Sequence, residues 1–268
     1  MQLIDLTRPL ESVPIESFPE ILRPLHRIIS PEVEFVGHGA GAEIMGELFG
    51  CQAEDLPAGE GWAEENISIS SHLGTHVDAP WHYGSTSAGK RAKTVDEIAL
   101  ADLYLDGCVL DLTARKGSGA AISVDDLKRA LDVIEYTIKQ GDAVLLRTDH
   151  DKFALTDPIR YLYPGLVRES ALYLMESGAR VGGTDATGFD RPFPMMIADW
   201  KRTGDKRFIW DAHYACREHE FYVVQQLANL DRLPAKGFKV GFFPLKLVGA
   251  SAAPARAVAF VDDGKGST

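Results

Sequence analysis

The sequence predicts a single α/β domain. Segments with the alternating pattern of strands and segments with helical periodicity follow one another along the whole chain. At 268 residues the chain is long enough to bury one large hydrophobic core. No internal repeat and no low-complexity linker divides it, so we expect one domain over residues 1–268.

The N-terminal part begins with a short strand candidate at residues 3–6, within an expected extended arm over residues 1–30. Prolines 9, 14, 19 and 24 interrupt this arm and favour irregular structure. Residues 32–36 predict a second strand, and glycines 37, 39 and 41 after it predict a turn. Residues 65–70 alternate between polar and apolar side chains, which predicts a sheet strand that runs directly into the histidine-rich segment described below.

The rest of the chain predicts three helices and further strands. The first helix has Ser123 as its N-cap and Asp126 three residues later, and it turns three apolar side chains inward: Leu127, Leu131 and Val133. A second helix is expected at 168–177, ended by Gly178, and a short third one at 213–218. Strands are expected at residues 103–112, 143–146, 181–185, 221–224, 238–243 and 255–261, before a frayed tail at 262–268.

Composition excludes several classes of protein. A net charge of −11 argues against a surface for nucleic acid or anionic membrane, because both favour clustered Lys and Arg. The three cysteines are far apart and form no C-x-x-C pair, which disfavours a disulfide scaffold and a zinc knuckle. The start of the chain lacks signal-peptide features, and no apolar run approaches membrane-spanning length. We therefore expect a soluble, cytoplasmic protein, and the charge alone identifies no partner.

The segment from Ser71 to His82 concentrates potential metal ligands. His72, His76, Asp78 and His82 all lie at even positions, so in an extended segment their side chains project to one side. Two imidazoles and a carboxylate can hold a catalytic divalent metal and leave coordination positions for water and substrate. A structural cluster is the alternative, but burying four such groups without partners would cost several kcal/mol.

This ligand set is compatible with two chemistries, metal-dependent hydrolysis and non-haem iron oxygenation. His82 favours hydrolysis, because a nearby imidazole can move protons near neutral pH. The sequence has no G-x-S-x-G elbow, no P-loop and no H-E-x-x-H motif. A non-catalytic metal-binding scaffold is a third alternative, and such a protein would have no use for His82.

The segment from His72 to His82 resembles the H-x-G-T-H-x-D-x-P-x-H signature of the cyclase-type metal-dependent hydrolases, the family of bacterial kynurenine formamidase and isatin hydrolase. The similarity extends over most of the chain, at residues 4–7, 141–148, 181–185, 227–231 and 254–257. The resemblance implies a swivelling β/β/α domain, with a mixed sheet that curls toward a barrel and flanking helices. It also implies a homodimer or a higher homo-oligomer.

Carried over to matching positions, the resemblance implies that His72, His76 and Asp78 bind the metal and that His82 is the catalytic acid/base. It adds two site residues twelve positions apart, His213 and Gln225. The dizinc formamidases have a bridging glutamate at the second position, so Gln225 departs from their pattern. A neutral amide lacks the charge to hold two cations close together. We therefore expect one divalent metal per chain, with manganese preferred to zinc.

These features predict a metal-dependent amidohydrolase that opens a cyclic amide, lactam or imide with a metal-activated water, with isatin-like substrates as the leading class. The nearest alternative is an aryl formamidase acting on N-formylkynurenine. Trp62 and Trp81 are candidates for a flat apolar wall that binds the substrate, although both are equally compatible with a place in the core. His150 and His219 are expected at the surface.

Overall fold

The computed structural model describes residues 1–262, so nearly all of the predicted frayed tail lies outside the described residues. Its centre is an eight-stranded mixed sheet in the order β1-β14-β13-β7-β9-β11-β12-β4, in which β14 also pairs with β4. The strands are β1 (Gln2–Asp5), β4 (His76–Asp78), β7 (Tyr104–Asp111), β9 (Ala143–Arg147), β11 (Val181–Thr184), β12 (Tyr222–Gln225), β13 (Lys236–Pro244) and β14 (Ala252–Val261).

The long strand β14 closes this sheet into a barrel. Its first residues, 252–254, pair with β4, whereas residues 258–261 pair with β1 on the same edge. Strands β7, β9, β11 and β12 run parallel to one another, and the remaining pairs are antiparallel. The ring therefore contains seven strands, with β1 added beside the second half of β14. This arrangement confirms the predicted mixed sheet that curls toward a barrel.

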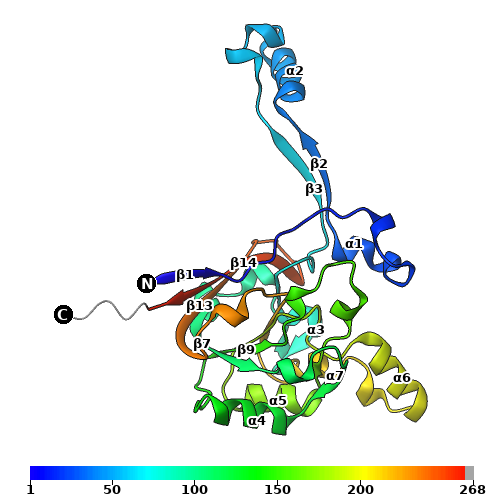
Figure 1. Ribbon diagram of the computed structural model, residues 1–268. Helices are drawn as coiled ribbons and strands as arrows, with labels where there is room; N and C mark the ends of the chain where they lie inside the picture. Colours follow the sequence, from blue (N-terminus) through cyan, green and yellow to red (C-terminus); the bar gives the residue numbers. More distant parts are fainter. Residues whose placement is uncertain (263–268) are drawn as a thin grey trace, which may run out of the picture.

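The helices α4 (Val124–Val133), α5 (Arg168–Glu176) and α7 (Asp211–Ala215) cover the outer face of the parallel strands (Figure 1). Strand β9 is buried on both faces, as expected for a parallel strand that is covered by helices. Leu145 packs inside the barrel, whereas Val144 and Leu146 pack outward against the helical layer. The predicted capping box of α4 is confirmed, but Val133 is 83% exposed and faces away from the core.

A second sheet of two strands, β2 (Glu32–Val36) and β3 (Glu64–Ser68), projects from the barrel and carries α2 (His38–Phe49) at its end (Figure 1). We call residues 32–68 the hairpin arm. The predicted strand at 65–70 therefore pairs in this arm and does not carry the histidine segment on a barrel sheet. The predicted turn at glycines 37–41 is also wrong, because helix α2 begins at His38. A Cβ atom at Gly41 would lie 1.9 Å from the Trp62 carbonyl oxygen, so the glycine permits close packing in the arm.

Smaller elements connect these parts, and within residues 1–262 no helix is both long and apolar enough to cross a membrane. The remaining helices of α type are α1 (His26–Ile29), α3 (Pro80–Tyr83) and α6 (Phe193–Thr203), and the short strand pairs are β5 (Thr86–Ser87) with β6 (Lys90–Arg91), and β8 (Ala121–Ile122) with β10 (Gly165–Leu166). The 3-10 helices are η1 (Ile15–Ser17), η2 (Glu20–Leu25), η3 (Ala53–Asp55), η4 (Pro57–Gly59), η5 (Val95–Glu97), η6 (Leu100–Leu103), η7 (Thr113–Arg115), η8 (His150–Lys152), η9 (Pro158–Tyr161), η10 (Lys206–Phe208) and η11 (Leu230–Arg232).

Candidate metal centre and active site

The histidine-rich segment crosses the barrel wall at the point where β4 lies between β12 and β14. Only His76–Asp78 is a strand, so His76 and Asp78 share one face of β4 as predicted. His72 lies in the turn before the strand, and His82 lies on α3, which begins at Pro80. The expectation of one extended segment from 72 to 82 is therefore wrong, although the strand does end before the proline. The backbone folds at both ends of β4 and still brings the side chains together.

Asp78 is the centre of the cluster. Its side chain is fully buried, and its Oδ1 atom lies 2.9 Å from His72 Nδ1 and 3.3 Å from His76 Nε2. On the other side, Gln225 Nε2 donates a hydrogen bond of 2.7 Å to Asp78 Oδ2. Gln225 reaches this position because it pairs with His76 in the register of β12 and β4. His213 Nε2 lies 3.7 Å from the same oxygen.

The donor atoms around Asp78 Oδ1 fit a bound cation. His76 Nδ1 lies 2.7 Å from the Gly74 carbonyl oxygen, which can only accept, so Nδ1 carries the proton and Nε2 presents its lone pair to Asp78. Among the described residues, no group donates a hydrogen bond to Asp78 Oδ1. A buried carboxylate oxygen without a partner costs free energy, and it also faces the imidazole lone pair. A divalent cation between these atoms would interact favourably with both Asp78 Oδ1 and the lone pair of His76 Nε2.

Ionisation of Asp78 is favoured by its surroundings. Burial raises the pKa of a carboxyl group, but the neighbouring imidazoles of His76, His213 and His72 outweigh it and hold the pKa of Asp78 well below its usual range. Ser251 holds the orientation of the His72 ring, because its Oγ lies 3.1 Å from His72 Nε2, the ring nitrogen that faces away from Asp78. Contacts of this kind orient metal-binding imidazoles. The cluster is therefore both charged and held in place.

His82 lies directly beside the potential ligands. Its ring centroid is 4.0 Å from that of His72, and one ligand atom from each of His72, Asp78 and His82 lies within 4.8 Å of the others. Burial, together with the neighbouring His72 and His213, lowers the pKa of His82 to about 4 and outweighs the opposite effect of Asp78. His82 is therefore neutral near pH 7 and can accept a proton. The geometry also brings it within reach of the cation that the cluster would hold.

His213 is held by two residues that the sequence did not indicate, Asp190 and Trp210. The Asp190 carboxylate accepts from His213 Nδ1, and it also accepts from the backbone N–H of Ala212 at 2.8 Å. The Trp210 ring stacks on the His213 ring at 4.5 Å and 12°. Burial lowers the pKa of His213, but Asp190 and Asp78 outweigh it and raise the pKa to about 9. His213 is therefore a buried imidazolium beside Asp78.

The other predicted residues fall into two groups. His213 and Gln225 join the cluster, whereas Trp62 lies on the hairpin arm, with its backbone packed against Gly41 of α2. Trp81 lies on α3 and is 42% exposed. The prediction that His150 is at the surface is wrong, because it is fully buried next to Thr148, and the N–H of Gly117 donates to its Nε2.

Comparisons with known proteins identify the family of this chain. The family model described as "Putative cyclase" matches residues 4–191. The chain is 29% identical over 197 residues to a kynurenine formamidase of Maricaulis maris, covering 72% of this chain and 78% of that protein. It is 28% identical over 209 residues to an isatin hydrolase of Roseibium aggregatum, covering 72% and 73%, respectively.

Isatin hydrolase A from Labrenzia aggregata, solved with benzyl benzoate, has the same fold with a TM-score of 0.72 and 25% sequence identity. This likeness covers 97% of this chain and 93% of that chain, so it includes the barrel and the helical layer. Together with the family match over most of the chain, it confirms the resemblance that the histidine-rich segment indicates. The chain belongs to the Cyclase family.

Proposed function

We propose that this protein is a metal-dependent hydrolase of carbon–nitrogen bonds that opens a small cyclic amide, lactam or imide of the isatin type. The observation that carries this proposal is the buried Asp78 Oδ1, which faces His72 Nδ1 and His76 Nε2 without a hydrogen-bond donor. The similarity to an isatin hydrolase and to kynurenine formamidases supports hydrolysis as the reaction class. Because both kinds of relative are about equally similar, formamide hydrolysis is the second candidate.

His72, His76 and Asp78 would hold one divalent cation per chain. Bound there, the cation supplies Lewis acidity, which polarises a carbonyl and acidifies water. The mixed set of nitrogen and oxygen donors suits manganese first and zinc second. Gln225 keeps the site at a single cation, because its neutral amide already uses its N–H to bind Asp78 Oδ2 at 2.7 Å.

His82 would move the proton. A neutral imidazole with a pKa of about 4 can accept the proton of the attacking water as the new C–O bond forms. The same nitrogen then returns that proton to the leaving nitrogen as the C–N bond breaks. The contact between the rings of His82 and His72, at 4.0 Å, places this base next to the ligands.

His213 would stabilise negative charge on the substrate oxygen. It is protonated near neutral pH, since its pKa is raised to about 9, and a preorganised cation in a buried site stabilises a developing oxyanion. Asp190 and Trp210 hold the ring in place. Trp81, next to His82 in sequence and 42% exposed, is our candidate for a wall of the substrate site. Trp62 stays a substrate-binding candidate through the arm of a neighbouring chain.

A substrate panel with metal analysis tests this proposal. Purified protein loaded with manganese or with zinc is assayed on isatin and on N-formylkynurenine, with and without oxygen, and the metal per chain is measured. We expect oxygen-independent opening of isatin with one metal per chain. Two metals and activity only on the formamide would support the formamidase instead. Oxygen-dependent turnover would indicate an oxygenase, and metal binding without turnover of any amide would indicate a scaffold.

A further inference from the structure

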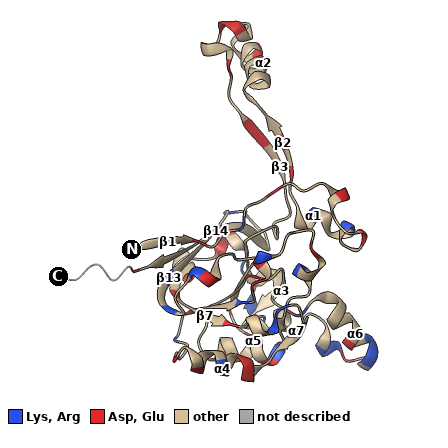
Figure 2. Cartoon of the chain, viewed as in Figure 1, with Lys and Arg blue, Asp and Glu red and all other residues tan. Residues whose placement is uncertain are grey.

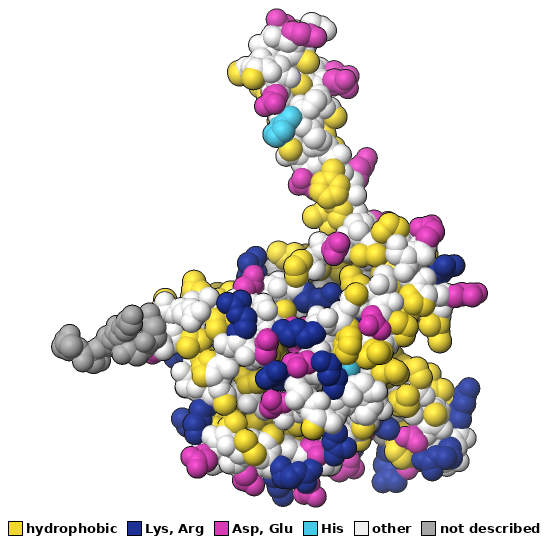
Figure 3. All heavy atoms as spheres, in the orientation of Figure 1, with side chains coloured by type: hydrophobic (Ala, Val, Ile, Leu, Met, Phe, Trp, Pro, Cys, Tyr) yellow, Lys and Arg dark blue, Asp and Glu magenta, His cyan; other side chains and the backbone are white. Residues whose placement is uncertain are grey.

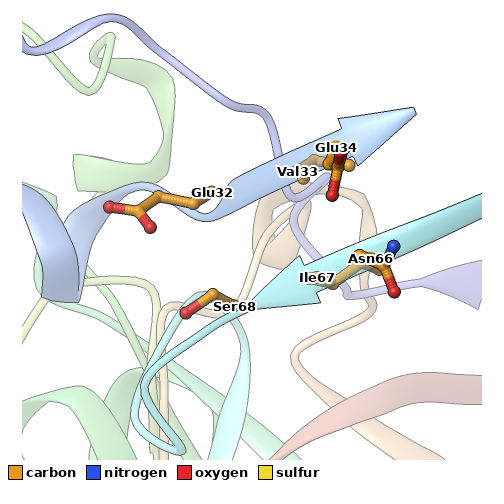
Figure 4. A pocket seen from close by; sticks show the side chains of 6 residues that line it. All are labelled: Glu32, Val33, Glu34, Asn66, Ile67 and Ser68. Atoms are coloured by element: carbon orange, nitrogen blue, oxygen red, sulfur yellow. The ribbon is translucent and has the colours of Figure 1, made fainter. Parts of the chain in front are cut away.

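The surface of the hairpin arm does not form a preorganised binding site. Figure 4 shows an open hollow along its two strands, lined by residues of which none is buried: Glu32, Val33, Glu34, Asn66, Ile67 and Ser68. Acidic side chains run from the base of the arm to its end (Figure 2), and apolar side chains lie between them (Figure 3). Buried polar groups near the metal ligands, by contrast, are held in fixed positions. Tyr83 is such a group, and the mechanism proposed above gives it no role.

The Tyr83 hydroxyl bridges two strands that carry the site. Tyr83 is the last residue of α3 and is 1% exposed. Its hydroxyl accepts a hydrogen bond of 3.0 Å from the Val223 N–H and donates one of 3.2 Å to the Asp78 carbonyl oxygen. These roles are fixed, because a backbone N–H can only donate and a carbonyl oxygen can only accept. Asp78 and Val223 are partners in the register of β4 and β12, so the phenol holds the strand of Asp78 against the strand of Gln225.

The Tyr83 ring contacts the two histidines that the proposed mechanism uses in addition to the metal ligands. Its centroid lies 5.8 Å from that of His82 and 5.5 Å from that of His213, with angles of 66° and 63° between the ring planes. Edge-to-face contacts of this kind are favourable and fix the orientation of both rings. Because its side chain is buried, Tyr83 would act through these neighbours and not through contact with a substrate.

Helix α3 depends on this anchor. It is a single turn of four residues, which is too short to be stable by itself. Its backbone is tied to the next segment of the chain by the Trp81 N–H, which donates to the Lys93 carbonyl oxygen at 2.9 Å. The Tyr83 hydroxyl ties the end of the helix to the barrel. Since His82 directly precedes Tyr83 in the sequence, this anchor sets where the His82 ring lies relative to Asp78.

We propose that Tyr83 is a positioning residue for the hydrolysis described above. Its hydroxyl ties α3 to β4 and β12 and so holds His82 at its working distance from Asp78. A displacement of about 1 Å in an active site can cost about 100-fold in rate. Loss of the hydroxyl therefore lowers turnover more than substrate binding, and it also weakens metal binding by loosening the strand that carries Asp78. This role rests on the proposed function, because it takes Asp78 as a metal ligand and His82 as the acid/base.

Tyr83→Phe tests this role, because it keeps the ring and removes both hydrogen bonds. Each protein is loaded with manganese and assayed on isatin and on N-formylkynurenine, and its affinity for manganese is measured in a competition titration. We expect kcat to fall at least about tenfold with KM within about twofold of wild type, and the dissociation constant for manganese to rise about tenfold. Thermal unfolding checks that each protein is folded at the assay temperature.

Incorporation of 4-aminophenylalanine at position 83 tests for rescue. The amine restores a donor to the Asp78 carbonyl oxygen on a ring of the same size. We expect kcat to return to within about threefold of wild type, which a change in overall stability would not produce. If Tyr83→Phe does not fold, this protein is the test, and a kcat more than about tenfold below wild type would overturn the role of the bridge.

The matched control is Tyr222→Phe, at the neighbour of Val223 on β12. Tyr222 is also fully buried, and its hydroxyl lies 2.9 Å from a carboxylate oxygen of Glu220 and 3.4 Å from one of Asp102. We expect its kcat and its manganese affinity to stay within about twofold of wild type, because neither contact reaches the site. Equal losses in the two variants, or a Tyr83→Phe protein that matches wild type in both measurements, would overturn the role of Tyr83. A wild type that binds manganese but hydrolyses neither amide would refute the proposed function alone, since the two affinities still test the bridge.

Discussion

Replacing Gln225 with glutamate is expected to convert the site from one cation to two. In the wild-type protein the Gln225 amide donates to Asp78 Oδ2 at 2.7 Å. In Gln225→Glu the donor becomes a second carboxylate at about the same place, and His213 Nε2 lies 3.7 Å from Asp78 Oδ2. Two carboxylates and two nearby imidazoles can bind two cations that share Asp78 and the new glutamate. Without metal, the same two carboxylates repel each other.

The size of this repulsion follows from the distance. Two unit charges 2.7 Å apart interact with about 6 kcal/mol at an effective dielectric constant of about 20. The protein can avoid this repulsion by keeping one of the two carboxyl groups protonated. Protonation costs about 1.4 kcal/mol for each pH unit above the ordinary pKa of glutamate, and this amounts to about 5 kcal/mol at pH 8. The metal-free variant is therefore expected to lose about 5 kcal/mol of unfolding free energy at pH 8, and less at pH 6.

Urea unfolding of chelator-treated protein measures this loss, and metal analysis after dialysis against manganese or zinc measures the stoichiometry. Gln225→Met is the control, because it removes the hydrogen bond to Asp78 without adding charge and costs only about 1–3 kcal/mol. If Gln225→Glu still binds one metal per chain, or if its metal-free form is as stable as Gln225→Met at pH 8, the reasoning about Gln225 is wrong.

Two further predictions concern the residues around the cluster. In metal-free protein, burial lowers the pKa of His213 but Asp190 and Asp78 raise it to about 9, so its pairing contributes stability that is fully present below about pH 6.5 and is lost as the pH rises through about 9. The difference in unfolding free energy between wild type and His213→Gln should therefore shrink over that range, and a constant difference would contradict the charged pair. Ser251→Ala removes the contact to His72 Nε2 and is expected to weaken metal binding about 10-fold to 100-fold in a competition titration, whereas unchanged affinity would show that Ser251 does not orient His72.

The sequence predicts that four of these side chains come together, because they are close along the chain. His72, His76, Asp78 and His82 span eleven residues, so local geometry alone brings them near one another. His213 and Gln225 could be placed only through the family resemblance, since neither has a distinctive local pattern. Asp190, Trp210 and Ser251 were missed for the same reason. Gln225 and Ser251 reach the histidine-rich segment only when β12 and β14 pair with β4.

The fold shows the same limit. Alternation in residues 65–70 correctly indicated a strand but could not identify its partner. The partner strand β2 is separated from it in the sequence by the whole of α2. The glycine-rich start of α2 predicted a turn, since glycine disfavours helices, yet Gly41 and Gly46 are where the helix packs closely on neighbouring backbone. His150 was expected at the surface because no motif assigned it a role. It is buried because the folded chain brings Gly117 beside it, and the N–H of Gly117 donates to His150 Nε2.

The metal content of two matched variants tests the central claim most directly, because the geometry places both His76 and His82 beside Asp78. His76→Ala and His82→Ala each remove one imidazole from the same cluster, and bound metal is measured after equal loading. We expect His76→Ala to lose the metal, and His82→Ala to keep one metal per chain while its turnover falls at least about 100-fold. Loss of metal from His82→Ala, with metal retained in His76→Ala, would contradict the assignment of ligand and acid/base.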